Sequence, residues 1–222
     1  MAYLRSARRS GVILECNAQV HAMTFADDHW QIQTRNGEHL AKMVVNAAGA
    51  WADEIAILAG IEPVNITPMR RTMVQLQTDP PSSFDSELIV ALNGDFYFKP
   101  EAGGGYWLSP HDETPSAAID VAPEELDIAI AIDRFEHVLD VEIKSVTRKW
   151  AGLRSFAPDR LPVYGYEPDH RQFFWFAGQG GFGIQTAPAA ARLAKSLLLD
   201  QPLDGMVDTL SPERYSPSRF RE

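Results

Sequence analysis

The stretch Gly178-Gln179-Gly180-Gly181-Phe182-Gly183-Ile184-Gln185-Thr186-Ala187-Pro188 follows directly on the aromatic run Phe173-Phe174-Trp175-Phe176-Ala177. Four of the six positions from Gly178 to Gly183 are glycine, and an alanine-rich segment follows. Glycines let the backbone pass close to a ligand, and the free N–H groups and dipole of a following helix favour an electron-rich group. The pattern therefore predicts a strand, a loop that approaches a ligand, and a helix. The alternative is a tight strand-to-helix turn.

A second motif, Trp150-Ala-Gly-Leu-Arg154-Ser-Phe156, precedes this loop along the chain. We expect Arg154 on a short turn at the end of a strand. A guanidinium group can pair with a carboxylate through two parallel hydrogen bonds. The two motifs together predict a cofactor cradle beside a cation that recognises an acid. The alternative for Arg154 is an ordinary salt bridge.

Composition narrows the class of protein. With 222 residues and 45% hydrophobic content, the chain can bury one large core or two modest ones. Its net charge of −10 argues against binding to nucleic acid. No apolar run is long enough to span a bilayer, and the N-terminus lacks the apolar stretch of a signal peptide. These features predict a cytoplasmic protein without an integral membrane segment.

Cysteine and histidine offer no further chemistry. The single cysteine, Cys16, excludes an internal disulfide, and we expect it to pack as a small apolar residue in a strand. His111, His137 and His170 lie in unrelated contexts without metal-ligand spacing, so no metal site is predicted.

Hydrophobic periodicity predicts a mixed fold of the α+β and α/β classes. Helices are expected over 3–10, from about 50 to Gly60, from Pro123 onward and over 187–199, and strands over 12–16, 19–25, 30–35, 43–46, 73–77, 88–92, 96–98, 106–109, 144–150 and 173–177. Residues 1–60 and 146–222 are expected to frame one domain. Residues 61–145 are expected to form an inserted domain with an antiparallel sheet and a long helix.

Three stretches resemble the FAD-dependent amine and amino-acid oxidoreductases of the D-amino-acid oxidase (DAO) type. They are residues 44–52, Ala151-Gly-Leu-Arg154, and Gly178 to Ile184. Within that family, three stretches are most similar to the bacterial D-arginine dehydrogenases: Pro68-Met-Arg-Arg-Thr72, Asp95-Phe-Tyr-Phe-Lys-Pro100, and Trp150-Ala-Gly-Leu-Arg-Ser-Phe156 with Gln179-Gly-Gly-Phe-Gly-Ile-Gln-Thr186. The resemblance covers nearly the whole chain.

The resemblance implies FAD as cofactor, with residues 1–60 and 146–222 as part of the FAD-binding domain and 61–145 as the substrate-binding domain. The residues implied for the cofactor are Ala47, Ala48, Gly49, Trp51, Gly178, Gln179, Gly180, Gly181, Phe182, Gly183 and Ile184. Close packing of a helix on a strand is the alternative explanation for the small residues 47–49. Core packing or helix capping is the alternative for Ile184 and Gln185.

The same resemblance implies a small-molecule amino-acid substrate, bound by Arg154, Tyr97, Arg71, Gly181 and Gln185. Arg154 and Tyr97 match the residues that hold the substrate carboxylate. Alternation places Tyr97 on the strand face opposite Phe96 and Phe98. Neighbouring residues of a strand point to opposite faces, so only one of Arg70 and Arg71 is expected at the site, and we favour Arg71.

The implied reaction is oxidative deamination of an amino acid, in particular a D-amino acid such as D-arginine, to the 2-oxo acid and ammonia. Glycine or sarcosine oxidation is the alternative within the family. The sequence does not open with the βαβ unit that holds the FAD pyrophosphate in this family. We therefore expect a C-terminal portion that binds FAD weakly alone. Such a portion would associate with a complementing N-terminal chain or with itself, and the further alternative is a non-catalytic fragment or one subunit of a split flavoenzyme.

Overall fold

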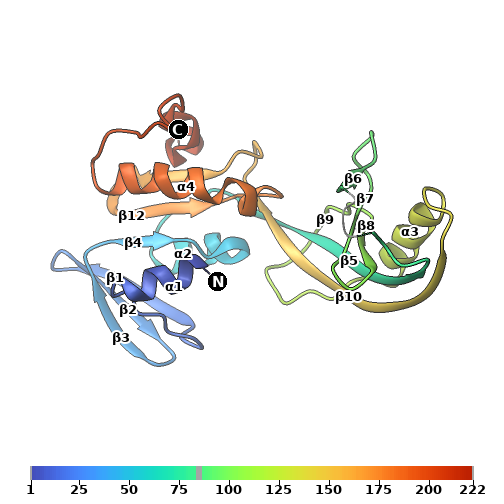
Figure 1. Cartoon of the computed structure of the whole chain (residues 1–222). Helices are drawn as coiled ribbons and strands as arrows, with labels where there is room; N and C mark the ends of the chain where they lie inside the picture. The colour runs from blue at the N-terminus through green and yellow to red at the C-terminus, as the bar shows by residue number, and fades with distance from the viewer. Residues whose placement is uncertain (1, 84–86, 222) are drawn as a thin grey trace.

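The computed structural model of the chain, shown in Figure 1, describes residues 2–83 and 87–221. Three sheets organise the described residues: a three-stranded antiparallel sheet near the N-terminus, a six-stranded sheet, and a three-stranded sheet that includes one parallel pair. The expected mixed fold with antiparallel sheets is confirmed.

The N-terminal region begins with a short exposed helix and an antiparallel meander. Its elements are α1 (Ala2–Arg9), β1 (Val20–Ala26), β2 (His29–Thr34), β3 (Gly37–Ala41), β4 (Val44–Asn46), the 3-10 turn η1 (Gly49–Trp51) and α2 (Ala52–Leu58). Trp30 of β2 is buried and donates a hydrogen bond from Nε1 to the carbonyl of Gln172, 2.9 Å away. This contact fixes the meander against the C-terminal part of the chain.

The six-stranded sheet runs in the order β10-β5-β8-β7-β6, and β9 pairs with β5 at one end. Its elements are β5 (Thr67–Asp79), β6 (Ile89–Val90), β7 (Tyr97–Pro100), β8 (Gly105–Ser109), β9 (Thr114–Pro115) and β10 (Glu142–Phe156), with α3 (Glu125–Glu136) between β9 and β10 along the chain. In Figure 1 the long strands β5 and β10 run as a ribbon from the region that holds both termini to the region that holds α3.

The third sheet has the order β11-β12-β4 and carries the final helix. Its C-terminal elements are β11 (Val163–Glu167), β12 (His170–Ala177), α4 (Gly183–Leu198), η2 (Pro212–Tyr215) and η3 (Pro217–Phe220). Strand β12 lies parallel to β4, with Phe174 opposite Val45. The carboxyl ends of β4 and β12 therefore lie at the same edge of the sheet, where ligands bind in open α/β folds.

Two hydrophobic cores lie at opposite ends of the β5–β10 ribbon. One packs around Trp30, Phe173 and Trp175, which join the meander to the β11-β12-β4 sheet. The other packs around Phe98 and Phe135, where α3 covers one face of the six-stranded sheet. A smaller cluster beneath α4 includes Tyr164 and Leu193. The domain boundaries expected from the sequence stay a prediction.

Alternation gives the two faces of the six-stranded sheet different characters. Val74 and Leu76 of β5 face α3 and are completely buried. Their neighbours Met73 and Gln75 are only half-buried, on the opposite face. Since residues paired across two strands share a face, Arg71, Gly152 and Tyr97 belong to that second face, hereafter the open face.

Several local expectations were wrong. Residues 12–16 form no strand, and Cys16 is exposed, because this segment pairs with no neighbouring strand in the described structure. Strands β3 and β11 were not expected. Helix α4 begins at Gly183, four residues earlier than expected, so Pro188 lies inside the helix, where its missing N–H removes one hydrogen bond to the preceding turn. Arg154 lies inside β10 and not on a turn, because β10 stays paired with β5 as far as Phe156.

Candidate active site

The glycine-rich loop connects β12 to α4. Gly178 and Gly180 adopt left-handed φ angles of 73° and 55°, which other residues rarely reach. The spacing of Gly178, Gly180 and Gly183 matches G-x-G-x-x-G, the fingerprint of a dinucleotide-binding turn. In that fingerprint a parallel strand follows the helix, whereas the described residues after α4 form 3-10 turns. The loop thus has the local spacing of the fingerprint without its βαβ setting.

Two glycines of this loop make room for side chains of β10. A Cβ on Gly180 would lie 2.6 Å from Cε1 of Phe156, and a Cβ on Gly181 would lie 2.6 Å from Nη1 of Arg154. Gly180 cannot carry a side chain without moving the Phe156 ring, and a side chain at Gly181 would displace the guanidinium end of Arg154. The close packing of the loop on β10 therefore explains the glycines at 180 and 181. The same packing places the loop against Arg154.

The N-terminus of α4 is open. Phe182 occupies the N-cap position without a capping hydrogen bond from its side chain, and it is 63% exposed. The next residue but one, Ile184, is 96% exposed. The first N–H groups of a helix need acceptors, and the positive end of the helix dipole favours negative charge. This end of α4 therefore fits an electron-rich group placed beside Arg154.

A groove of about 1040 Å³ lies along α4. Its wall includes Gln179, Gly183 and Ile184 from the loop and the first turn of the helix. Gln185 lies in the same turn and is exposed. At the other predicted cofactor segment, Gly49 has a φ of 60°, and the turn η1 contacts β10. Gly49 and Trp51 thus lie in a turn that contacts the strand carrying Arg154, and Ala47 and Ala48 directly precede that turn.

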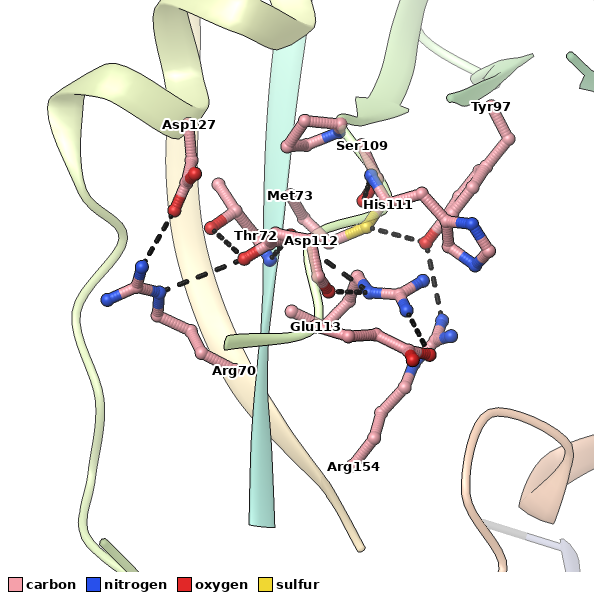
Figure 2. Close-up of polar contacts among 12 residues, drawn as sticks. Arg70, Thr72, Met73, Tyr97, Ser109, His111, Asp112, Glu113, Asp127 and Arg154 are labelled. Carbon is pink, nitrogen blue, oxygen red and sulfur yellow. Dashed lines mark hydrogen bonds and ion pairs between the residues drawn. The ribbon is translucent and has the colours of Figure 1, made fainter. Parts of the chain in front are cut away.

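Arg154 and Tyr97 meet on the open face of the six-stranded sheet, as Figure 2 shows. Nη2 of Arg154 donates to the Tyr97 hydroxyl at 3.4 Å, and that hydroxyl donates to Sδ of Met73 at 3.2 Å. The two residues come from β10 and β7, which are separated in the sheet by β5 and β8. The long Arg154 side chain therefore reaches across the sheet to Tyr97.

Arg71 lies in the same group and is only 4% exposed. Its Nε donates to the Asp112 carbonyl at 2.7 Å, and its Nη2 donates to Oε1 of Glu113 at 3.0 Å. Its Nη1 is buried and has no hydrogen-bond partner within the described part of the chain. Burial lowers the pKa of Arg71, and the positive charge of Arg154 lowers it further. An anion between the two guanidinium groups would relieve both costs.

Glu113 is the acidic side chain that faces this pair. It also accepts a hydrogen bond from Arg160 at 2.7 Å. Burial alone would raise the pKa of Glu113, but the hydrogen bond and charge of Arg160 and the charge of Arg71 outweigh it and lower the pKa. Glu113 is therefore ionised at neutral pH and held between two arginines.

Arg70 has a different environment. Its Nη2 donates to Oδ2 of Asp127 at 2.9 Å, and its Nη1 pairs with Glu124. Figure 2 shows it directed toward Asp127, away from Arg154 and Tyr97. The structure therefore places Arg71, and not Arg70, beside the other predicted substrate residues.

Two members of the group were not anticipated from the sequence. Met73 follows Arg71 by two positions on β5, so alternation could have identified it. The His111 ring packs edge-on against Tyr97, with centroids 5.6 Å apart, and its Nδ1 donates to the carbonyl of Gly94. No periodic signal could have found His111, because it lies in an irregular segment.

Comparison with known proteins agrees with this architecture. Residues 1–197 match the DAO family model, described as FAD dependent oxidoreductase. Glycine oxidase of Pseudomonas putida is 27% identical over 84% of this chain and 48% of its own length. Dimethylglycine dehydrogenase of Rattus norvegicus is 26% identical over 97% of this chain and 27% of its own length.

Among solved structures, L-proline dehydrogenase from P. horikoshii superimposes with a TM-score of 0.84 at 24% identity. That match covers 99% of this chain and 58% of the other. The chain spans about half or less of the length of the curated relatives that it matches. The likeness is not specific to D-arginine dehydrogenase, the member that the sequence motifs favoured.

No helix in the parts of the chain described, 2–83 and 87–221, combines the length and the apolar character needed to cross a membrane. The family match extends over most of the chain and includes both the glycine-rich loop and the arginine cluster on the open face. The chain belongs to the family of FAD-dependent oxidoreductases.

Proposed function

We propose that this chain supplies the substrate-binding surface, and part of the cofactor-binding surface, of an enzyme that oxidises an amino acid. The observation that carries the proposal is the Arg154–Tyr97 pair, which lies directly beneath Gly181 and beside the uncapped N-terminus of α4. This arrangement puts an acid-recognising group next to a site for an electron-rich group. Residues 61–145 would form the substrate domain, and 1–60 with 146–222 the cofactor-binding part.

The residues present fit FAD at two places. The backbone of Gly181 to Ile184 at the start of α4 would face the electron-rich edge of the flavin, and residues 47–49 with Trp51 would border its adenosine side. The bound flavin would supply an acceptor for the hydride that leaves the substrate Cα. The helix dipole of α4 would stabilise the negative charge that accumulates beside it.

The substrate carboxylate is the group that Arg154 and Arg71 would bind. Arg154 would form the two-pronged hydrogen bond, Tyr97 would donate a third, and the unpartnered Nη1 of Arg71 would provide charge from the other side. Because all three come from paired strands of one sheet, the carboxylate would be held rigidly and the Cα–H bond would keep one orientation. Gly181 and Gln185 would border the same space.

The substrate is the least constrained element of the proposal. Similarity to glycine oxidase and dimethylglycine dehydrogenase favours a small amino acid such as glycine or its N-methyl derivative sarcosine. The sequence motifs favour a D-amino acid such as D-arginine. A second candidate function is that of one subunit, or a non-catalytic portion, completed by another chain or by a second copy. A cytoplasmic location stays a prediction.

Binding of a carboxylate can be measured on this chain without FAD. We expect acetate to bind in calorimetric titrations and Arg154→Lys to weaken it on the order of tenfold or more, because the planar donor pair is lost. Arg160→Lys is the matched control, since Arg160 is an exposed arginine that binds Glu113 at the edge of the same group. Acetate binding that is unaffected by Arg154→Lys would contradict the proposal.

A further inference from the structure

Residues 211–221, hereafter the C-terminal tail, pack over strand β11. The two 3-10 turns of the tail, η2 and η3, both contact β11, and Pro217 of η3 is buried. Phe220 packs against the core around Trp175. The tail follows the residues that match the family model, 1–197. It is therefore a well-packed part of this fold although it lies outside that match.

Arg219 of the tail binds the segment that leaves β10. Its Nε donates to Oδ2 of Asp159 at 2.7 Å, and its Nη2 donates to Oδ1 of the same carboxylate at 3.2 Å. Nη2 also donates to the carbonyls of Leu161 and Pro162, at 3.0 Å and 3.1 Å, while Nη1 donates to two carbonyls of the tail itself. The hydrogen bond from Arg219 lowers the pKa of Asp159, so this carboxylate is ionised at neutral pH. One guanidinium group thus joins the tail to three residues just beyond the end of β10.

Arg221 binds the segment that leads into β5. Its Nη1 and Nη2 donate to the carbonyls of Pro63 and Glu62, at 3.1 Å and 2.6 Å. Its Nε and Nη2 also donate to the two carboxylate oxygens of Glu167 in β11, at 3.0 Å and 2.8 Å. Glu167 is itself buried and accepts a hydrogen bond from Nε1 of Trp175 at 2.9 Å. Arg221 therefore connects the start of β5 to the interior of the β11-β12-β4 sheet.

The two segments lie where the chain crosses between its two large cores. Ile66 belongs to the core around Trp175, and Val74 belongs to the core beneath α3. The chain passes from the first core to the second along β5 and returns along β10, and Thr67 pairs with Phe156 at the root of this ribbon. Two cores joined by a short connection move relative to one another unless contacts hold them. The tail supplies such contacts at both strands.

The root of the ribbon also carries the glycine-rich loop. The N–H of Gly180 donates to the carbonyl of Ser155 at 2.8 Å, and the same glycine packs on the Phe156 ring. Arg71 and Tyr97 lie farther along the six-stranded sheet. A change in the direction of the ribbon at its root would therefore shift these two residues relative to the loop and to the N-terminus of α4.

We infer that Arg219 and Arg221 are positioning residues: the tail holds both strands of the β5–β10 ribbon against β11 and so fixes the direction of the six-stranded sheet relative to the glycine-rich loop. The inference rests on the proposed function where it assigns carboxylate binding to the sheet and cofactor binding to the loop. Because Arg154, Arg71 and Tyr97 belong to one sheet, loosening the tail should preserve carboxylate binding and misalign the bound substrate with the cofactor.

Distances between two spin labels measure this positioning directly. Cys16 is the single cysteine and is exposed just before β1, so it takes one label, and Glu136→Cys at the end of α3 takes the other. Arg219→Gln and Arg221→Gln should each broaden the distance distribution about twofold or more, because the two cores then move relative to one another. Arg214→Gln is the matched control, since Arg214 is exposed in the same tail, and it should leave the distribution unchanged.

Lysine variants keep the test decisive if a glutamine variant proves unstable. Arg219→Lys and Arg221→Lys retain the charge, but one ammonium group cannot replace the planar set of donors, so both should also broaden the distribution. Circular dichroism checks that the variants compared are folded. Calorimetric titration should show that acetate affinity changes less than about twofold in each, because the tail is distant from the carboxylate-binding residues.

The FAD-bound enzyme gives a second measurement that a loss of folded protein would not change. The rate constant for flavin reduction in a single turnover does not depend on the fraction of active enzyme. In Arg219→Gln this rate constant should fall about tenfold or more while KM for the amino acid stays nearly unchanged, because the substrate binds but is poorly aligned. In Arg214→Gln neither quantity should change.

The outcomes separate the two proposals. If the Arg219 and Arg221 variants keep the distance distribution of the parent, or if they broaden it and reduce the flavin as fast as the parent, this inference is wrong and the proposed function stands. If acetate does not bind the parent, or if Arg154→Lys leaves acetate binding unchanged, the proposed function fails, and the positioning role fails with it whatever the distances show.

Discussion

Arg70 and Arg71 are neighbours in the chain and lie on opposite faces of the same sheet, in very different surroundings. On the face covered by α3, Arg70 pairs with Glu124 and Asp127 and also lies 3.8 Å from Asp112. On the open face, Arg71 is more deeply buried and pairs with Glu113, and its terminal Nη1 has no hydrogen-bond partner within the described residues. Arg70 also has one nitrogen without a hydrogen-bond partner there, but it is the Nε that lies 3.8 Å from Asp112. Both arginines therefore have counterions, and the unused terminal donor of Arg71 is the one that lies on the same face as Arg154 and is available to a ligand.

The largest expected effect belongs to the open face. In the FAD-bound enzyme, Arg154→Lys should lower kcat/KM for the preferred amino acid on the order of a hundredfold or more. The lysine keeps the charge but loses the paired donors, which costs roughly 2–4 kcal/mol. Steady-state kinetics with glycine, sarcosine, D-alanine and D-arginine would measure it. A larger effect of Arg70→Lys on kcat/KM would contradict the assignment of substrate binding to the open face.

The second prediction compares Arg70 and Arg71 directly. Arg70→Met should lower the free energy of unfolding by about 1–3 kcal/mol, because Asp127 loses its ion-pair partner in a poorly solvated region and Asp112, which Thr72 still holds, loses a nearby positive charge. Arg71→Met should cost less stability: it loses the hydrogen bonds to Asp112 and Glu113, but Arg160 still pairs with Glu113, and the cost of burying a guanidinium whose Nη1 has no partner within the described residues is removed. Urea denaturation followed by circular dichroism gives both values, and acetate titration should show the reverse order. Equal stability losses would remove the distinction.

A smaller effect is expected from the hydroxyl of Tyr97. Tyr97→Phe removes one neutral donor while Arg154 continues to hold the acid, so kcat/KM should fall on the order of tenfold. Its matched control is Tyr106→Phe, since Tyr106 packs in the core on the α3 side of the sheet. A Tyr97→Phe enzyme that is less active than Arg154→Lys would move the centre of carboxylate binding from β10 to β7.

The smallest expected effect concerns acid pH. The pKa of Glu113 is lower in the folded chain than its ordinary value of 4.5, because Arg160 and Arg71 favour the ionised form more than burial opposes it. The stability that Glu113 contributes is therefore present above that ordinary value and is lost as the pH falls through the lowered pKa. Glu113→Gln should flatten the decline of stability below about pH 4.5, as measured by urea denaturation at a series of pH values. A decline of unchanged steepness would contradict this assignment.

Periodicity located some of the residues that lie on regular strands. Alternation on β5 predicted that Arg70 and Arg71 point to opposite faces without deciding between them, and alternation on β7 placed Tyr97 opposite the buried Phe96 and Phe98, as the structure has them. The roles of these residues stay predictions. The order of elements was also largely recoverable, because long apolar strands and amphipathic helices carry strong signals.

The features that were missed depend on contacts between distant segments. Strand β3 is short and mostly exposed, so its residues show no clear alternation. Strand β11 begins just after Pro162 and contains Gly165, and both residue types are more typical of turns than of strands. Arg154 was expected on a turn at the end of a strand, but pairing with the distant β5 keeps this segment extended as far as Phe156. The hydrogen bonds that Thr72 donates to the Asp112 carboxylate likewise join a strand to an irregular segment about forty residues away, and no local pattern encodes them.

The pairing of β5 with β10 also has a consequence for how this chain folds. The two strands can pair only after the segment between Asp79 and Glu142 has been brought back on itself, so their ladder is built from contacts between residues far apart in sequence. Loop closure must precede the gain from such contacts, which slows folding. Helix α3 and strands β6 to β8 lie within that loop and can form their own core first. We therefore expect the α3 core to form early and the β5–β10 ladder to complete the barrier-crossing step, with Arg154 and Arg71 joining the same face only at that late stage.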